Sequence, residues 1–274
     1  MEKEELKEYY RFVAEENRII VSNNKYYLNG KCVRMKSTLK EHQAVNVISP
    51  TNIKEIKTKV ETREQSGICT GECRIRVIDS DSFHDPKMLV MNFANAKHPG
   101  GGYKNGAIAQ EESLCRQSTL YASIGSNKAR EMYRHNEYVN AAFDSEYMLI
   151  SPCVEIFRNS DMSLKEDTLT TAVITLPAPN RRGRAVRKTE EELRKVFEDR
   201  IRNMLYCAAY YGYKTLTLGA WGCGAFGNDP EMVAEAFRKV LDDENLNRFF
   251  GEIDFAIPGK NSRNYKAFSS FFTS

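Results

Sequence analysis

Strand-like and helix-like segments alternate along residues 172–257, and this alternation constrains the fold more than any other feature of the sequence. Short runs of β-branched and apolar side chains, typical of buried strands, occupy residues 172–176, 215–218 and 252–257. Between them, apolar residues recur at helical spacing after two helix start signals, the capping box of Thr189 with Glu192 and the pair Asp229-Pro230. The pattern predicts an α/β fold in which helical layers cover a mixed, largely parallel sheet.

The rest of the chain is less regular. Further strands are expected at 44–48, 74–79 and 89–94, with an apolar stretch over 147–157 that Ser151 and Pro152 interrupt. Helices are expected over 4–17, within 51–66 and over 262–272, a β-hairpin arm over 19–30, and a polar loop over 122–145. Too few residues separate the strands 74–79 and 89–94 for a standard parallel crossover. Residues 1–70 contain few large apolar side chains, so we predict that they wrap around a domain formed by residues 71–274.

Composition is that of an ordinary globular enzyme. The 274 residues are 41% hydrophobic and 28% charged, with a net charge of +3, which gives no general basic footprint for DNA. Seven scattered cysteines are an odd number and favour reduced thiols, and they lack the paired spacing of a zinc site. The charged N-terminus and the absence of a long apolar run indicate neither a signal peptide nor a membrane span. We therefore expect a cytoplasmic protein without a metal cofactor.

A glycine-rich stretch follows the strand predicted at 89–94. Gly100, Gly101 and Gly102 are consecutive, and after seven intervening residues Gln110, Glu111 and Glu112 begin a short helix. Three glycines in a row permit positive φ angles and allow a ligand to lie directly against the backbone. The acids suit a helix N-terminus and could also perform acid–base chemistry. The alternative is a flexible turn followed by an ordinary acidic helix start.

A second glycine-rich loop, residues 219–227, lies between a predicted strand and a predicted helix. Open α/β sheets bind ligands at this position, and bare N–H groups beside a helix N-terminus are suited to a diphosphate. The loop has neither the spacing of a dinucleotide fingerprint nor the lysine of a P-loop. An equally plausible role at this stage is to pack Trp221 and Phe226.

The order of these features resembles one enzyme family. An apolar strand with Asn92 and Asn95, then Pro-Gly-Gly-Gly, a seven-residue spacer and Gln-Glu-Glu is similar to the signature of the compact, bacterial-type poly(ADP-ribose) glycohydrolases, which are relatives of the macrodomain. The loop at 219–227 also looks like the diphosphate-binding segment of that family, and the resemblance extends over about residues 74–260. It implies a three-layer α/β/α macrodomain-like fold with an N-terminal extension. It also implies hydrolysis of ribose–ribose O-glycosidic bonds in poly(ADP-ribose) to release ADP-ribose, without a cofactor.

The resemblance also implies roles for individual residues. Glu112 would be the general acid and base, Glu111 would bind ribose hydroxyls beside the scissile bond, and Asn95 would bind the ribose being cleaved. Adjacent helical residues diverge by about 100°, so the two acids cannot flank one bond, which fits this division of roles. Ile257 is a weaker candidate for contact with adenine. The remaining expected substrate contacts are Gly100, Gly101, Gly102, Gln110, Gly222, Cys223, Gly224, Ala225 and Phe226, of which the glycines, Cys223 and Ala225 would surround the diphosphate.

Two alternatives to polymer hydrolysis stay open. A mono-ADP-ribosyl-protein hydrolase would use the same acid on an ADP-ribosylated protein, whereas a non-catalytic ADP-ribose-binding module would have no need of the paired glutamates. Outside the motifs, His98 is expected to be an ordinary loop residue and Cys223 to be structural, because no partner that would activate a thiol is evident. The cluster Arg181, Arg182 and Arg184 would either contact polymer phosphates or, as we favour from sequence, form a solvated loop.

Overall fold

The fold is a seven-stranded sheet between two layers of helices, as the alternation predicted. The computed structural model describes residues 2–64 and 72–272, so Cys69 and the predicted boundary at 70/71 lie outside the described residues. The strand order is β3-β6-β7-β5-β8-β9-β4. Strands β7, β5, β8, β9 and β4 run parallel to their neighbours, and β6 and β3 are added antiparallel at one edge.

The strands have the following bounds: β3 Asn46–Ile48, β4 Arg74–Ile78, β5 Leu89–Ala94, β6 Met148–Arg158, β7 Leu164–Pro177, β8 Thr215–Leu218 and β9 Glu252–Ala256. The α-helices are α1 Lys3–Asn23, α2 Leu39–His42, α3 Pro50–Glu64, α4 Gln110–Gln117, α5 Leu120–Ile124, α6 Arg130–Val139, α7 Glu190–Tyr210, α8 Pro230–Arg238 and α9 Arg263–Phe272. A separate hairpin pairs β1 Lys25–Leu28 with β2 Lys31–Arg34.

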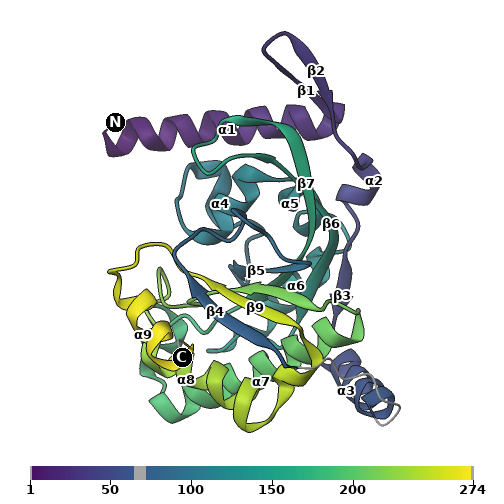
Figure 1. Cartoon of the computed structure of the whole chain (residues 1–274). Coiled ribbons are helices and arrows are strands. Elements are labelled where there is room, and N and C mark those ends of the chain that lie inside the picture. Colours follow the sequence, from purple (N-terminus) through teal and green to yellow (C-terminus); the bar gives the residue numbers. More distant parts are fainter. Residues whose placement is uncertain (1, 65–71, 273–274) are drawn as a thin grey trace.

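Each face of the sheet has its own hydrophobic core. Helices α3, α7, α8 and α9 pack on one face, around side chains such as Phe197, Phe237 and Phe255. Helices α4, α5 and α6 cover the other face, and α1 lies beside α4 at the top of the molecule (Figure 1). The expected helix starts are present: Thr189 caps α7 in a capping box, and the Asp229 carboxylate accepts from the main-chain N–H groups of Glu231 and Met232.

Residues 2–64 contact the rest of the chain at several places. Strand β3 forms the antiparallel edge of the sheet, and α3 packs against α7 (Figure 1). Helix α1 lies on the segment after the first glycine loop, where the Cβ of any residue replacing Gly106 would be 2.4 Å from the main-chain oxygen of Lys7. The described helices include none that is long and apolar enough to cross a membrane.

Three local predictions were wrong. Residues 19–22 belong to α1, because Ile20 is buried against Tyr26 and Met35, and the hairpin begins only at Lys25. The region 122–145 contains most of α5 and all of α6, a mostly polar helix whose buried side chains, Met132, Tyr133 and Asn136, lie on one face. Ser151 and Pro152 do not divide a strand, because a bulge between Ser151 and Val154 lets β6 continue.

The short connection between residues 78 and 89 also has a structural explanation. Strand β4 does not pair with β5: it lies at the far edge of the sheet beside β9, with β8 and β9 between the two. The connection is still a crossover between parallel strands, but it contains no helix, and it passes β9, where Lys87 forms ion pairs with Glu252 and Asp254. Lys87 and Met88 also approach β8, and their main-chain N–H groups donate to the hydroxyls of Thr217 and Thr215.

Candidate active site

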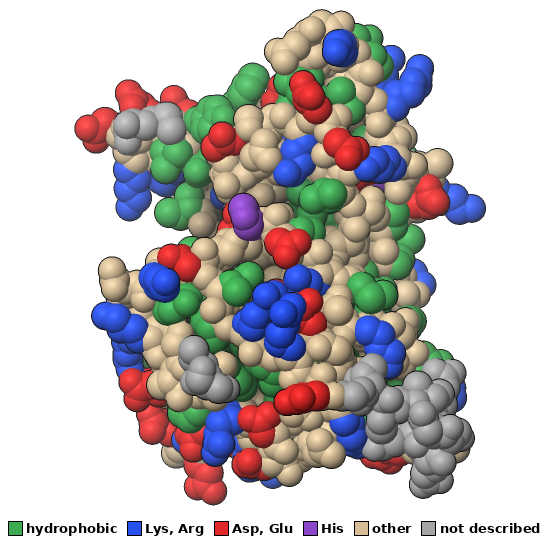
Figure 2. Space-filling view, viewed as in Figure 1, with side chains coloured by type: hydrophobic (Ala, Val, Ile, Leu, Met, Phe, Trp, Pro, Cys, Tyr) green, Lys and Arg blue, Asp and Glu red, His purple; other side chains and the backbone are tan. Residues whose placement is uncertain are grey.

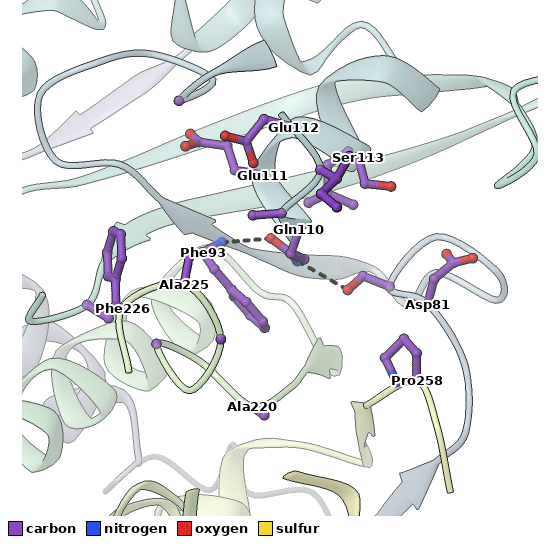
Figure 3. Close-up of a pocket in the computed structure, with 18 of the residues that line it drawn as sticks. Asp81, Phe93, Gln110, Glu111, Glu112, Ser113, Ala220, Ala225, Phe226 and Pro258 are labelled. Carbon is purple, nitrogen blue, oxygen red and sulfur yellow. Dashed lines mark hydrogen bonds between the residues drawn. The ribbon is translucent and has the colours of Figure 1, made fainter. Parts of the chain in front are cut away.

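A cavity of about 480 Å³ lies where β5, β8 and β9 end, between the loops that follow these strands. Its lining includes both predicted glycine-rich segments, the start of α4 and Asn264 of α9. The space-filling view is hollowed at the left, between the first turns of α1 and the region of α9 (Figure 2). The close-up shows Glu111 and Glu112 above the rings of Phe93 and Phe226, with Asp81 and Pro258 at the opposite end (Figure 3).

The first glycine loop holds the two glutamates. The N–H of Gly102 donates to Oε1 of Glu112 over 2.8 Å, and the N–H of Gly100 donates to Oε1 of Glu111 over 3.2 Å. Gly100 and Gly101 have φ angles of 70° and 54°, in the left-handed region that favours glycine. A Cβ at residue 101 would be 2.5 Å from Oε1 of Glu112, so a side chain there would displace the carboxylate.

The two glutamates differ in the partners of their oxygens. Both oxygens of Glu111 accept hydrogen bonds, Oε1 also from the Asn92 amide and Oε2 from the N–H of Asn95 at 2.8 Å. In contrast, Oε2 of Glu112 has no hydrogen-bond partner among the described residues, although it is buried at the cavity wall. A buried, unpartnered oxygen is costly unless a ligand or water uses it. Glu112 is thus the acid available for chemistry.

Two opposing effects act on Glu111. Burial raises the pKa of its carboxyl to about 8, and the neighbouring Glu112 acts in the same direction. The donors from Asn95, Asn92 and Gly100 oppose this, since hydrogen bonds to the charged form lower a carboxyl pKa. The net result is a carboxyl that is more easily protonated than an ordinary glutamate.

Gln110 fastens the start of α4 to β5. Its Oε1 accepts from the N–H of Phe93 at 2.9 Å, while its Nε2 donates to the Met91 carbonyl at 2.8 Å and to the Ser82 hydroxyl at 3.1 Å (Figure 3). These bonds use the side chain fully within the protein. Gln110 therefore fixes the helix that carries the glutamates, and it also lines the cavity.

Asn95 organises the loop after β5. Its Oδ1 accepts from the N–H groups of Lys97 and His98, each at 2.9 Å. Its side-chain amide group has no partner among the described residues' hydrogen bonds, and the residue lines the cavity. The Asn95 NH₂ group is thus oriented by the loop and can donate to a ligand hydroxyl.

Buried side chains hold the second glycine loop in place. The Trp221 ring is fully buried, packs edge-on against Phe197, and donates from Nε1 to the Leu176 carbonyl at 3.1 Å. The Asn228 amide donates to the carbonyls of Pro179 and Gly222, at 2.8 and 3.0 Å. Four residues of this loop have main-chain N–H groups without a protein acceptor in the described parts of the chain. They are Gly222, Gly224, Ala225 and Phe226.

This difference between the two loops separates their roles. All three N–H groups of the first loop have protein acceptors, because that of Gly101 donates to the His98 carbonyl at 2.9 Å. The second loop alone presents a set of unused N–H groups, next to the N-terminus of α8. An anionic group in the cavity is therefore better served by the second loop.

Comparisons with known proteins identify the family of the chain. The model described as "Microbial-type PARG, catalytic domain" matches residues 14–159. The chain belongs to this family. The poly(ADP-ribose) glycohydrolase (PARG) of Thermomonospora curvata is 29% identical, with a TM-score of 0.86 over 97% of this chain and 100% of that chain. PARG of Deinococcus radiodurans in complex with ADP-ribose is 31% identical, with a TM-score of 0.75 over 87% and 98% of the two chains. A search of curated protein sequences found no match.

As a PARG, the chain brings the predicted site residues together in one cavity. Glu111, Glu112, Asn95, Gly101, Gly102, Gln110, Gly222, Gly224, Ala225 and Phe226 all line it, as does Ile257. Gly100 lies behind the glutamates. Cys223 packs beside the core, burial raises the pKa of its thiol, and the thiol contacts the Trp221 carbonyl, which fits a structural role.

Several PARG site residues were not evident from sequence. Phe93 points into the cavity from a strand that reads as uniformly buried, Asp81 and Ser82 reach it from a weakly patterned loop, and Asn264 reaches it from the start of α9. Asn92 bridges Glu111 and Thr175 inside the sheet, at 3.2 Å from each. The only available signal was its polarity, since a buried amide within an apolar strand needs a partner.

Proposed function

We propose that this chain hydrolyses the ribose–ribose O-glycosidic bonds of poly(ADP-ribose), with Glu112 as the general acid and base. The observation that carries the assignment is the unpartnered Oε2 of Glu112, at a cavity wall where both oxygens of Glu111 already accept hydrogen bonds. The Gly102 N–H fixes the other oxygen, so the free oxygen is aimed rather than mobile. Membership of the PARG family and the ADP-ribose complex of the Deinococcus radiodurans enzyme support the substrate class.

In the reaction, Glu112 first donates a proton and later takes one back. Protonated Glu112 gives its proton to the leaving ribose 2′-oxygen as the bond from that oxygen to the anomeric carbon breaks, leaving an oxocarbenium-like centre. The resulting carboxylate then takes a proton from a water molecule, whose oxygen bonds to the anomeric carbon. The products are free ADP-ribose and a polymer shortened by one unit, and Glu112 is again protonated.

Other residues bind and position the substrate in this proposal. The free amide group of Asn95 donates to a hydroxyl of the ribose being cleaved, and Phe226 packs against that ribose. Glu111, which still has lone pairs on its oxygens, accepts from a ribose hydroxyl and holds the loop through Asn95 and Gly100. The diphosphate binds to the unused N–H groups of the second glycine loop, whereas the sequence resemblance implied that both glycine loops surround it.

We also propose that residues 1–70 wrap around and support the catalytic domain of residues 71–274. The Asn17 amide donates to the Arg116 carbonyl at 2.6 Å, and the Tyr103 hydroxyl contacts the Ala14 carbonyl at 3.3 Å. The Arg116 guanidinium lies over the Tyr10 ring, 4.1 Å from its centroid, and donates to the Ala107 carbonyl. Helix α1 thereby supports both α4 and the segment between the glycines and the glutamates.

The test is release of ADP-ribose from an automodified, polymer-bearing protein. Wild-type chain should remove the polymer rapidly, whereas Glu112→Gln and Glu112→Ala should lose at least about 100-fold in rate and still bind ADP-ribose by calorimetry. Glu8→Gln, at an exposed position on α1, is the matched control. Removal of single ADP-ribose marks with polymer left intact would identify a mono-ADP-ribosyl-protein hydrolase. Binding without any turnover would identify an ADP-ribose-binding module.

A further inference from the structure

A second cavity, of about 270 Å³, adjoins the active site. It shares two lining residues with the first cavity, Asn95 and Phe226, and these are the two residues assigned to the ribose being cleaved. Asp81 and Pro258 line only the first cavity, and they lie at the end away from Phe226 (Figure 3). The second cavity therefore continues the site on the side of the scissile bond.

Two cationic side chains and two amides are among the residues that line this second cavity. Its charged lining residues are Lys97, Arg184 and Asp144, together with His98 and the neutral Asn180. Lys97 Nζ donates one hydrogen bond, to Oδ1 of Asn140 at 2.8 Å, which leaves two of its three donors. Arg184 has a single long contact, 3.4 Å from Asp144, which leaves most of its five N–H donors.

The loop that carries Arg184 is hydrogen-bonded to a residue of the active site. The N–H groups of Gly183 and Ala185 donate to the Asn180 carbonyl, and the N–H of Arg182 donates to the carbonyl of Phe226 at 3.2 Å. On the other wall, the N–H groups of Lys97 and His98 hold the side chain of Asn95. The two cations are thus fixed to the same residues that are assigned to the ribose.

Two other polar groups line this cavity. Asp144 is largely buried, and burial raises the pKa of its carboxyl despite the nearby Arg184, Arg200 and Lys97. The Oδ1 atom of Asn180 is buried and has no hydrogen-bond partner within the described chain, which indicates a polar group or water in the cavity.

We propose that Lys97 and Arg184 form a subsite for the diphosphate of the leaving unit, the ADP-ribose that precedes the scissile bond in the polymer. This inference rests on the proposed function. In poly(ADP-ribose) the leaving 2′-oxygen belongs to an adenosine ribose whose 5′-oxygen carries a diphosphate, so each cut releases an anionic chain end on the Phe226 side. Lysine and arginine donors suit such phosphates. A protein side chain bearing a single ADP-ribose has no phosphate there, so the subsite favours polymer.

The test compares two substrates that differ only beyond the scissile bond. Di-ADP-ribose carries the second diphosphate, whereas ADP-ribose with an uncharged nitrophenyl group on its terminal anomeric oxygen does not. We expect Lys97→Ala/Arg184→Ala to lower kcat/KM for di-ADP-ribose about 10-fold more than for the nitrophenyl glycoside. Lys97→Arg should preserve the wild-type ratio. Arg187→Ala, which removes an exposed cation from the same loop outside both cavities, is the matched control. An equal effect on both substrates, or none, would overturn the proposal.

A binding measurement separates this proposal from the proposed function. In the Glu112→Gln protein, di-ADP-ribose should bind about 10-fold more tightly than ADP-ribose at low salt. That advantage should vanish in the Lys97→Ala/Arg184→Ala form and shrink with added salt. If wild-type chain cleaves neither substrate, the proposed function fails, and this binding difference still decides the subsite. Equal affinities for the two ligands would refute it.

Discussion

A Cβ on residue 101 would lie 2.5 Å from Oε1 of Glu112, so the backbone of Gly101 and the carboxylate proposed as catalytic share a space that admits no side chain. Gly101→Ala should therefore push the carboxylate away from the Gly102 N–H. Displacement of a catalytic group by about 1 Å costs on the order of 100-fold in rate. We expect kcat for polymer hydrolysis to fall by that factor, while the fold is retained.

The control for this substitution is Gly251→Ala. Residue 251 lies away from the site, has no positive φ, and its Cβ would meet only the Lys214 carbonyl, at 3.9 Å. Thermal unfolding of both variants separates a local from a global effect. Full activity in Gly101→Ala would mean that the observed position of Glu112 is not required for catalysis.

Glu111 should make stability depend on pH in a defined direction. Its pKa rises from 4.5 to about 8 on folding, so the folded carboxyl retains a proton that the unfolded chain has lost. The associated stability is complete below pH 4.5, decreases as pH rises, and is lost above about pH 8. Because glutamine does not titrate, the Tm of Glu111→Gln relative to wild type should increase between pH 5 and pH 9.

Thermal unfolding across this pH range shows whether burial or hydrogen bonding has the larger effect on the pKa of Glu111. If its three N–H donors outweighed burial, the carboxyl would stay ionised, and the difference in Tm would be constant with pH. Glu8→Gln, exposed on α1, should give a constant difference in either case. Activity of Glu111→Gln should also fall, because an amide offers the Asn95 and Gly100 N–H groups only one acceptor oxygen in place of two.

The second glycine loop depends on Asn228. Asn228→Ala removes the donors to the Pro179 and Gly222 carbonyls, and residue 228 is buried. The buried Pro179 carbonyl then lacks this donor, whereas the Gly222 carbonyl keeps the main-chain N–H of residue 228, and the loss should cost about 1–3 kcal/mol of unfolding free energy. Loss of the loop geometry should also weaken ADP-ribose binding about 10-fold, measured by calorimetry. Asn127→Ala, at an exposed position, should change neither; unchanged ADP-ribose affinity in Asn228→Ala would exclude this loop as the diphosphate site.

The sequence predicted the features that depend on local patterns. The alternation over 172–257 gave the parallel strands and α7, and both helix starts at Thr189 and Asp229 were confirmed. It failed where tertiary contacts outweigh local preference. Ile19 and Ile20 look like strand residues, yet burial of Ile20 keeps them in α1, and α6 is held by three buried side chains in an otherwise polar segment.

At the site, too, local patterns were predicted from the sequence, whereas contacts between distant segments were not. The motif residues line one cavity, but which glycine loop serves the carboxylates and which offers free N–H groups follows from hydrogen bonds between distant segments. Lys97 and Arg184 are 87 positions apart by numbering and meet only because loops after β5 and β7 adjoin. A solvated loop was therefore the better interpretation of the arginine cluster from sequence, although the structure places Arg184 at a cavity.

The support of α4 by α1 should be measurable through Asn17. This buried side chain donates to the Arg116 carbonyl at 2.6 Å and accepts from Arg158 Nε at 2.7 Å, so Asn17→Ala leaves both groups without that partner. The cost should be about 1–3 kcal/mol, or several degrees in Tm. Because α4 carries Glu112 in its first turn, kcat should fall more than ADP-ribose affinity does. Phe12→Ala, on the same helix but 63% exposed, should leave Tm and kcat nearly unchanged. A drop in Tm without any change in kcat would limit α1 to a structural role.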